Sequence, residues 1–259
     1  LSFSAVNGQE YKRIVSLSPS LTMNLYYLEA QDRLVGCTSY CEMAKPDHKP
    51  IIATAVQVSI EKVLQLKPDL VIATTITKLE TIEMFKKLDI PVEIFPTPKS
   101  FNEICSQFLR LGVLVGNQKL AGELIGQADS RVKELQELCT WNIPPKLFIQ
   151  IGSKPLYAAI PNTFMDDYIQ FVNGINITAD LSRGSLTREA VVARDPDVIL
   201  IVTMGIAGQE EKKMWENFDE MSAVRKKQIF FIDANLACTP TPVSFVETME
   251  IMLSLLKKL

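Results

Sequence analysis

Apolar runs of strand length alternate with segments of helical spacing along this chain. Predicted strands occupy residues 13–18, 34–38, 70–75 and 91–95, and predicted helices occupy 22–30, 60–66, 79–88 and 101–115. Pro19 and Ser20 are expected in the loop after the first strand, and prolines and hydrophilic residues between 39 and 58 predict an irregular surface segment. Strands that alternate with helices indicate an α/β fold with mostly parallel sheets and helices on both faces.

One pattern occurs twice. IEKVLQLKPDLVIAT (60–74) aligns with REAVVARDPDVILIV (188–202), and the identical pairs are Glu61/Glu189, Val63/Val191, Pro68/Pro196 and Asp69/Asp197. In each copy an acidic residue opens a helix, Pro-Asp follows its end, and an apolar run predicts a buried strand. Flanking segments also correspond: 13–20 with 146–153, and 90–96 with 228–234. The repeat predicts two α/β lobes of one plan with a cleft between them.

A long helix is predicted between the two copies. From Asn117 to Leu138 apolar side chains keep helical spacing without a proline, and WNIPP at 141–145 ends the pattern. A helix of this length spans roughly 33 Å, about the diameter of a small domain. We therefore predict an N-terminal lobe at 1–116, a connecting backbone helix at 117–140 and a C-terminal lobe at 141–259. A single helix between lobes predicts a stiff connection and a small closing motion.

Composition narrows the choice of partners. The 259 residues are 47% hydrophobic, enough for two modest cores, and carry a net charge of −3. Acids and bases are mixed without a basic stripe, so no nucleic-acid partner is expected. The apolar runs fall short of the ~20 residues that span a bilayer. Because the sequence begins at Leu1, we expect that a signal peptide or an N-terminal anchor has been removed.

The sequence contains few residues that would support an enzyme active site or a metal-binding site. His48 is the single histidine, so a Ser-His-Asp hydrolase or a histidine site for free metal would have to use it. No nucleophile elbow, Walker loop or Gly-x-Gly-x-x-Gly is present. Cys37 and Cys41 could form a disulfide or be plain small residues, and with His48 they match no closed zinc pattern. We expect no catalytic residues, no metal site and no intrinsic cofactor.

Three motifs, in this order and spacing, resemble a known family. They are RIVSLSPSLT followed by LVGCTSYC, then IEKVLQLKPDLVIAT, then LTREAVVARDPDVILIV. Nearly the whole chain resembles the substrate-binding proteins of ABC importers that carry cobalamin, haem and ferric siderophores, and TSYCE at 38–42 is most similar to the periplasmic cobalamin binders. The resemblance implies the class III periplasmic binding protein fold, with two lobes joined by one long rigid helix.

Glu61 and Glu189 match acidic residues that the cobalamin binders use to dock on arginines of the permease. The other interpretation is structural, because each carboxylate lies in a first helical turn, behind the expected caps Ser59 and Thr187, where the helix dipole stabilises it by roughly 0.3–1 kcal/mol. Their equivalent places in the two lobes favour docking.

Ligands of open α/β sheets bind beyond the carboxyl ends of the strands. The predicted ligand-binding residues at these ends are Ser18, Ser20, Tyr40, Thr75, Phe95, Lys154, Arg183, Met204 and Asn235, with Thr77, Thr97 and Ser153 at similar positions. By resemblance, Tyr40 matches a tyrosine placed against the corrin, although Val56 replaces a tryptophan of the cobalamin binders. Lys154 and Arg183 would suit haem propionates or an anionic siderophore.

The expected function is therefore the capture of a metal chelate in the cleft and its delivery to a permease. Cobalamin is the favoured ligand, and haem or a ferric siderophore is the alternative. The expected partners are an ABC permease dimer with its ATPase, and we expect a monomer outside the cytoplasmic membrane, with a lipoprotein anchor as one option. A metal-cofactor enzyme on a similar two-lobed scaffold is the competing class.

Overall fold

The computed structural model describes residues 10–54, 57–203 and 207–257. The chain divides into two compact units: Leu1–Thr97 with Cys105–Ile125, and Pro98–Ile104 with Gly126–Leu259. The boundary at Ile125 falls inside α5 (Gln118–Glu137), the continuous helix that the sequence predicts between Asn117 and Leu138. The lobe boundaries drawn at 116 and 141 remain predictions.

The sheet of unit 1 is entirely parallel. Its strands lie in the order β3 (Ile51–Ala53), β2 (Leu34–Thr38), β1 (Ile14–Ser16), β4 (Leu70–Thr74) and β5 (Val92–Phe95). β3 is a difference from the expected irregular segment at 39–58, which also contains the short 3-10 turn η2 (Glu42–Ala44). Three residues on a sheet edge are too few to produce a periodic signal.

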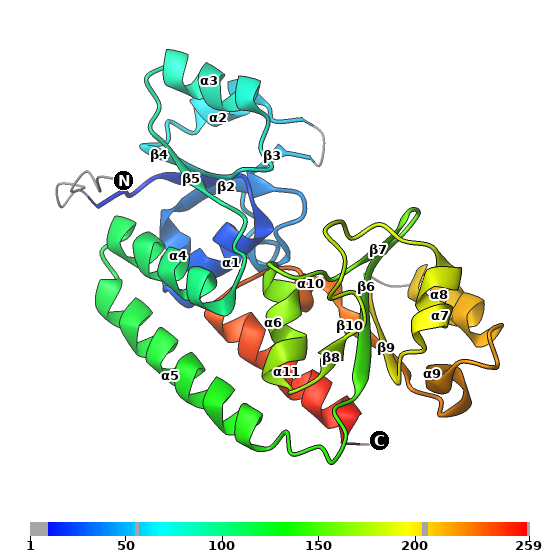
Figure 1. Ribbon diagram of the computed structural model, residues 1–259. Helices are drawn as coiled ribbons and strands as arrows, with labels where there is room; N and C mark the ends of the chain where they lie inside the picture. Colours follow the sequence, from blue (N-terminus) through cyan, green and yellow to red (C-terminus); the bar gives the residue numbers. More distant parts are fainter. Residues whose placement is uncertain (1–9, 55–56, 204–206, 258–259) are drawn as a thin grey trace. The chain divides into compact units, whose positions relative to one another are not determined.

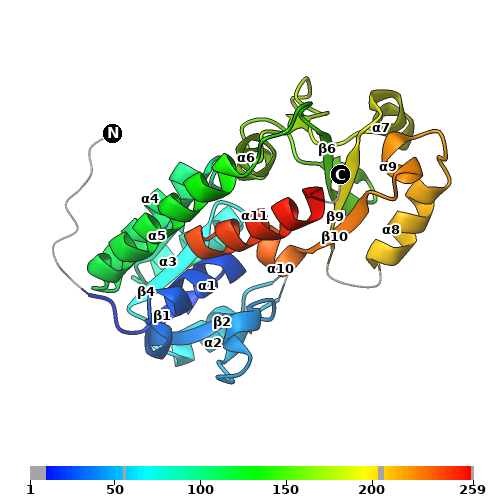
Figure 2. The ribbon, with the colours of Figure 1, turned by 90° about the horizontal axis from the view of Figure 1, so that it is seen from below.

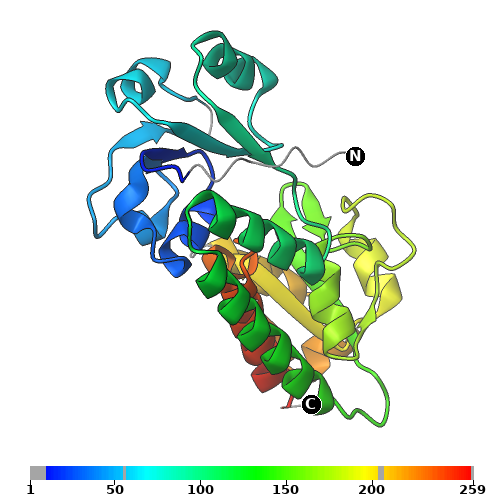
Figure 3. The ribbon, with the colours of Figure 1, turned by 90° about the vertical axis from the view of Figure 1, so that its left-hand side faces the viewer.

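Helices cover both faces of this sheet (Figures 1 and 3). On one face α1 (Pro19–Tyr27), α4 (Phe101–Leu114) and the start of α5 pack on side chains such as Ile14 and Ile72. On the other, α2 (Ile60–Gln65) and α3 (Leu79–Lys87) cover Val15 and Val71. The turn η1 (Gln31–Arg33) precedes β2.

Pro19 and Ser20 are not in a loop, as expected from the sequence, but in the first turn of α1. Proline is favoured there because its missing N–H is not needed and its fixed φ suits a helix. The same helix ends at Tyr27, earlier than predicted, because Glu29 adopts a left-handed φ of 53° and the Ala30 N–H donates to the Leu25 carbonyl.

The sheet of unit 2 repeats the central order of the first. β10 (Ile229–Asp233), β9 (Val198–Thr203), β6 (Lys146–Ser153) and β8 (Ile175–Asn176) are parallel, and β7 (Leu156–Ala158) is antiparallel to β6. The central pair of strands has the same register in both units, because Ile14 pairs with Leu70 as Leu147 pairs with Val198. The next pair is shifted by one residue from the correspondence of 90–96 with 228–234: Val71 pairs with Val92, whereas Ile199 pairs with Ile229 and not with Phe230. The predicted repeat of two mostly parallel α/β lobes is confirmed.

Both faces of this second sheet are also covered by helices (Figure 2). α7 (Arg188–Arg194), α8 (Ala207–Glu216) and α9 (Ser222–Arg225) pack on Phe148 and Ile199. On the other side lie α6 (Phe164–Phe171) and α11 (Pro242–Leu256), whose Tyr168 and Phe245 rings stack with centroids 4.4 Å apart. The short α10 (Ala234–Ala237) follows β10.

The repeated Pro-Asp has the same structural task in both units. The Asp69 carboxylate accepts the backbone N–H groups of Lys12 and Arg13 at 2.8 and 2.9 Å, just before β1. The Asp197 carboxylate accepts the Lys146 N–H at 3.0 Å, at the start of β6. Each aspartate therefore fixes the beginning of the central strand next to its own.

Candidate functional site

A pocket of about 240 Å³ lies at the carboxyl end of the parallel sheet in unit 1. It opens where β1 and β4 are neighbours but their connections leave in opposite directions, which is the usual ligand position in such sheets. Its wall is rich in hydroxyl groups and small apolar side chains. The lining residues are Leu17, Ser18, Pro19, Thr38, Ala53, Thr54, Gln57, Val58, Thr74, Ile76, Thr77, Lys78 and Thr81.

Of the strand-end residues predicted for unit 1, Ser18 and Thr77 line this pocket. Ser20 is not among the lining residues, but its hydroxyl lies 3.0 Å from that of Ser18. Thr75 is exposed between the lining residues Thr74 and Ile76, and its hydroxyl lies 3.4 Å from that of Thr97.

The two predicted aromatic residues differ in exposure. Tyr40 is 47% exposed beyond the end of β2. Phe95 belongs to the core of unit 1 and has no exposed surface, while the Arg110 guanidinium lies 5.3 Å from its ring centroid. Of the two rings, only that of Tyr40 is accessible to a ligand in this structure.

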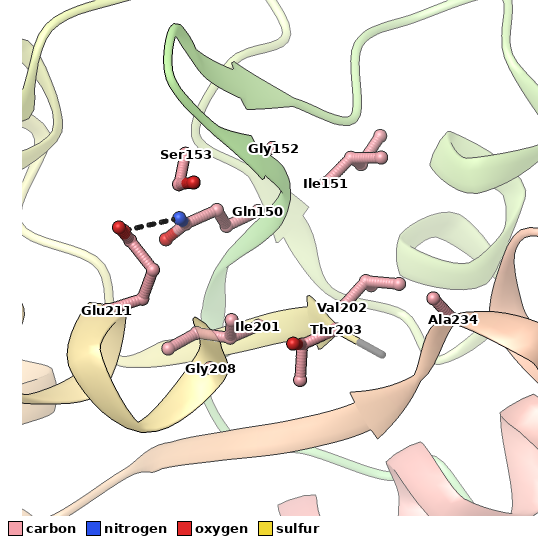
Figure 4. Close-up of a pocket in the computed structure, with 10 residues that line it drawn as sticks. All are labelled: Gln150, Ile151, Gly152, Ser153, Ile201, Val202, Thr203, Gly208, Glu211 and Ala234. Carbon is pink, nitrogen blue, oxygen red and sulfur yellow. Dashed lines mark hydrogen bonds between the residues drawn. The ribbon is translucent and has the colours of Figure 1, made fainter. Parts of the chain in front are cut away.

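A second pocket, of about 320 Å³, lies at the carboxyl ends of β6, β9 and β10 in unit 2 (Figure 4). Its lining residues are Gln150, Ile151, Gly152, Ser153, Ile201, Val202, Thr203, Gly208, Glu211 and Ala234. This edge of the sheet corresponds through the repeat to the edge that carries the pocket of unit 1. Each unit thus has a pocket where ligands of parallel sheets bind.

A buried polar cluster forms one wall of the unit 2 pocket. The Gln150 amide is 1% exposed; its Nε2 donates to the Glu211 carboxylate at 2.7 Å, and its Oε1 accepts the Trp215 indole N–H at 2.7 Å. Arg188, from the start of α7, donates to the same carboxylate oxygen of Glu211 and places its guanidinium carbon 4.6 Å from the Trp215 ring centroid. Fixed partners give the two pocket-lining groups, Gln150 and Glu211, defined orientations.

Of the strand-end residues predicted for unit 2, Ser153 lines this pocket, whereas Lys154, Arg183 and Asn235 are not among its lining residues. Asn235 follows the lining residue Ala234, and the exposed Lys154 follows the lining residue Ser153. Arg183 is exposed in the segment before α7. Met204 lies outside the described residues, directly after Thr203 of the pocket wall.

Glu61 and Glu189 occupy equivalent places. Both are exposed in the first turns of α2 and α7, and the Ser59 and Thr187 hydroxyls accept the N–H groups of Lys62 and Ala190 as the expected caps. The backbone N–H of Glu189 itself, followed by the Thr187 hydroxyl, holds the pKa of the Glu189 carboxylate below its usual value. The carboxylate therefore stays charged and accessible to a cationic partner.

Cys37 and Cys41 are buried free thiols in this structure. Hydrogen bonds from Cys37, Thr22 and Thr38 lower the pKa of the Cys41 thiol, although burial opposes them, and the hydrogen bond with Cys41 together with burial raises the pKa of the Cys37 thiol. Within residues 10–54, 57–203 and 207–257, no group of three or more His, Cys, Asp or Glu side chains is arranged to hold a metal ion. No helix in the same ranges is long and apolar enough to cross a membrane.

Sequence reasoning missed the Gln150, Glu211 and Arg188 cluster. The available signal was Gln150 itself, a polar residue within the apolar run of β6, because a buried amide must find partners. The sequence pattern could not identify those partners, because Arg188 and Glu211 belong to two different helices and come into contact only in the folded protein.

The chain belongs to the periplasmic binding protein family, which matches residues 14–236. It is 29% identical over 242 residues, 90% of this chain and 76% of the relative, to the uncharacterized ABC transporter substrate-binding lipoprotein YvrC of Bacillus subtilis. It is 26% identical over 205 residues, 78% of this chain and 73% of the relative, to the vitamin B12-binding protein of Yersinia pestis. The predicted family resemblance is confirmed.

Solved structures agree with the fold. The periplasmic vitamin B12 binding protein BtuF of Vibrio cholerae has a TM-score of 0.80 at 24% identity and covers 95% of this chain and 97% of its own. The periplasmic heme binding protein HutB of the same organism has a TM-score of 0.84 at 17% identity, covering 94% and 98%. The predicted class III binding-protein fold is therefore confirmed, and the family consists of solute-binding proteins.

Proposed function

We propose that this protein is the extracytoplasmic substrate-binding component of an ABC importer and that it captures a metal chelate, with cobalamin as the favoured ligand. The observation that carries the proposal is the pocket at the carboxyl edge of each unit's parallel sheet, in a chain of the periplasmic binding protein family. Haem or a ferric siderophore is the alternative ligand in the same role.

The choice of ligand class rests on the relatives and on the pocket walls. Relatives and structural neighbours are described as binding vitamin B12, haem or, in one case, possibly iron. Both pockets offer hydroxyl and amide groups beside apolar surface, which suits a ligand that has a large apolar body and peripheral polar groups. Tyr40 supplies an accessible ring in unit 1. Lys154 and Arg183 supply positive charge in unit 2.

Capture requires no chemistry of the protein. Affinity would come from the burial of ligand surface, at roughly 25 cal/mol per Å² of apolar area, and from oriented hydrogen bonds. We assign no catalytic residue and no intrinsic cofactor, and the chelate is cargo. An enzyme on a similar scaffold remains the competing class, and it would convert the chelate, whereas a receptor releases it unchanged.

Delivery would use Glu61 and Glu189. Two exposed carboxylates at equivalent positions of a repeated structure suit a partner with its own two-fold symmetry, such as a permease dimer with its ATPase. Arginines on the permease would be the complementary groups. We place the protein outside the cytoplasmic membrane as a monomer, held there as a lipoprotein or free in the periplasm, in keeping with the substrate-binding lipoprotein among its relatives.

The test is equilibrium dialysis of the purified protein against cyanocobalamin, haemin and a panel of ferric siderophores. We expect saturable one-to-one binding of one chelate and its recovery unchanged. Tyr40→Ala should weaken that binding by about 1–3 kcal/mol if the ring loses a buried contact. Met214→Ala, at a 48% exposed position on α8, is the control and should bind normally. Absence of binding to every chelate, or turnover of the bound one, would contradict the proposal.

A further inference from the structure

The polar cluster of unit 2 connects the pocket to the helix that carries a docking carboxylate. Glu211 and Gln150 line the pocket, and Arg188 holds Glu211 from the first turn of α7. Glu189 is the next residue in the chain and points its charge to solvent. One side chain, Arg188, therefore separates the pocket wall from the exposed carboxylate.

The Arg188–Glu211 pair is largely but not fully buried. Its side chains are 17% and 11% exposed, and Arg188 Nη1 is buried without a hydrogen-bond partner. The strength of such a pair depends on how much water reaches it, because the effective dielectric constant falls when water leaves. A ligand that fills the pocket beside Glu211 would remove the remaining water from one side of the pair.

Unit 1 lacks this connection. The residue that corresponds to Arg188 through the repeat is Ile60, which precedes Glu61 and packs against the apolar cluster under α2. The pocket of unit 1 approaches α2 through the lining residues Gln57 and Val58, which precede the cap Ser59, and no charged side chain of α2 is among its described lining residues. The same fold thus presents two docking carboxylates, of which one is joined to its pocket by charge and the other is not.

We propose that Arg188 is a positioning residue that orders the first turn of α7, and with it Glu189, when the pocket beside Gln150 and Glu211 is occupied. The permease would then distinguish loaded from empty receptor through the carboxylate of unit 2, whereas Glu61 of unit 1 would present the same surface in both states. The proposal rests on the proposed function, which supplies both the ligand and the docking partner.

Amide hydrogen exchange of the purified protein, with and without saturating cyanocobalamin or haemin, tests the proposal. We expect exchange in α7 to slow roughly tenfold with the chelate bound, a typical size for coupling between sites, and exchange in α2 to stay unchanged. Measurement at saturation removes differences in affinity from the comparison. Arg188→Gln should abolish the slowing in α7, and Arg188→Lys, which keeps the charge without the planar fork, should retain part of it.

Two controls complete the design. Ile60→Val, the conservative change at the matching position of unit 1, should leave the slowing in α7 intact. Because Arg188→Gln strands the Glu211 charge and could unfold, the double change Arg188→Gln/Glu211→Gln removes both charges and should also abolish the slowing.

The outcomes separate the two proposals. Binding of a chelate without slower exchange in α7, equal slowing in α2 and α7, or full slowing in Arg188→Gln would each overturn the role of Arg188 and leave the proposed function standing. Absence of binding by any chelate would overturn the proposed function, and the role of Arg188 with it.

Discussion

Gln150 shows how a single buried amide can organise a pocket wall. Its carbonyl oxygen and its amide nitrogen have different partners, Trp215 and Glu211, so the side chain has one orientation. A buried polar group left without a partner costs about 1–3 kcal/mol, and this cost makes the arrangement specific. The pocket therefore presents the Glu211 carboxylate in a defined position before any ligand arrives.

The two tryptophans offer a test of this cluster. Each indole N–H donates at 2.7 Å, but Trp215 is fully buried against Gln150, whereas Trp141 is partly exposed and donates to the Val172 carbonyl. Trp215→Phe should lower the free energy of unfolding by about 2–4 kcal/mol, because it leaves the Gln150 oxygen unpaired and opens space. Trp141→Phe should cost about 1 kcal/mol or less. Urea denaturation measures both, and equal costs would contradict the importance of the buried cluster.

Asp195 predicts a pH dependence. It lies at the left-handed position after α7, and its carboxylate accepts the Ser222 N–H at 2.6 Å and the Ser222 hydroxyl at 2.7 Å, which lowers its pKa. A lowered folded pKa stabilises the protein above the unfolded value, about 4, and this stabilisation is lost as the pH falls through the folded pKa. Asp195→Asn should cost about 1 kcal/mol at pH 7, because hydrogen bonds to a charged group are stronger than those to a neutral one, and progressively less below pH 4.

The repeat provides the control for this change. Lys67 has the same left-handed conformation after α2, with φ of 47°, but carries no carboxylate. Lys67→Asn should therefore show no acid-dependent difference from the wild type. A cost of Asp195→Asn that is constant between pH 3 and 7 would show that the charge is not responsible.

At the scale of elements, the segments that repeat were predictable and the irregular ones were not. The helix–Pro-Asp–strand pattern can be predicted from local sequence. A helix cap, a left-handed residue and an apolar run each depend only on residues that are close in the chain. Neither β3 nor the start of α1 was predicted. β3 is an edge strand of only three residues. α1 begins at Pro19, whereas proline in a sequence more often indicates a turn.

The junction of α4 and α5 carries a prediction at this scale. A Cβ added to Gly112 would lie 2.7 Å from the Ala121 Cβ, and the turn between the helices contains Gly116 at a φ of 70°. Gly112→Ala should lower the free energy of unfolding by about 1–2 kcal/mol, because the clash outweighs the gain in helix propensity of about 1 kcal/mol. Gly122→Ala, where a Cβ meets nothing within 4 Å, should instead stabilise by about 0.5–1 kcal/mol. Stabilisation by both changes would contradict close packing of the two helices.

For the whole molecule, the strand ends that the sequence singled out lie at the edge of each sheet that carries a pocket, but few of the predicted side chains line that pocket. Ser18 lines the pocket of unit 1, and Ser153 lines the pocket of unit 2. Phe95 ends a strand but is buried, because the last residue of a strand can still face the core. Whether the last side chain of a strand faces the core or the pocket depends on helices that are distant in the sequence. The apolar pattern of the strand contains no information about those helices.

Delivery of cargo by docking through Glu61 and Glu189 can be measured as uptake by vesicles that contain the permease and its ATPase. The measurement compares wild type, Glu61→Gln, Glu189→Gln and the double variant, each loaded with the chelate identified by dialysis. If the protein delivers cargo by docking through both carboxylates, all four bind the chelate equally. Each single change then reduces uptake severalfold, and the double change nearly abolishes it, because each unit would hold one half of the permease. Normal uptake by the double variant, with normal loading, would contradict docking through the two carboxylates.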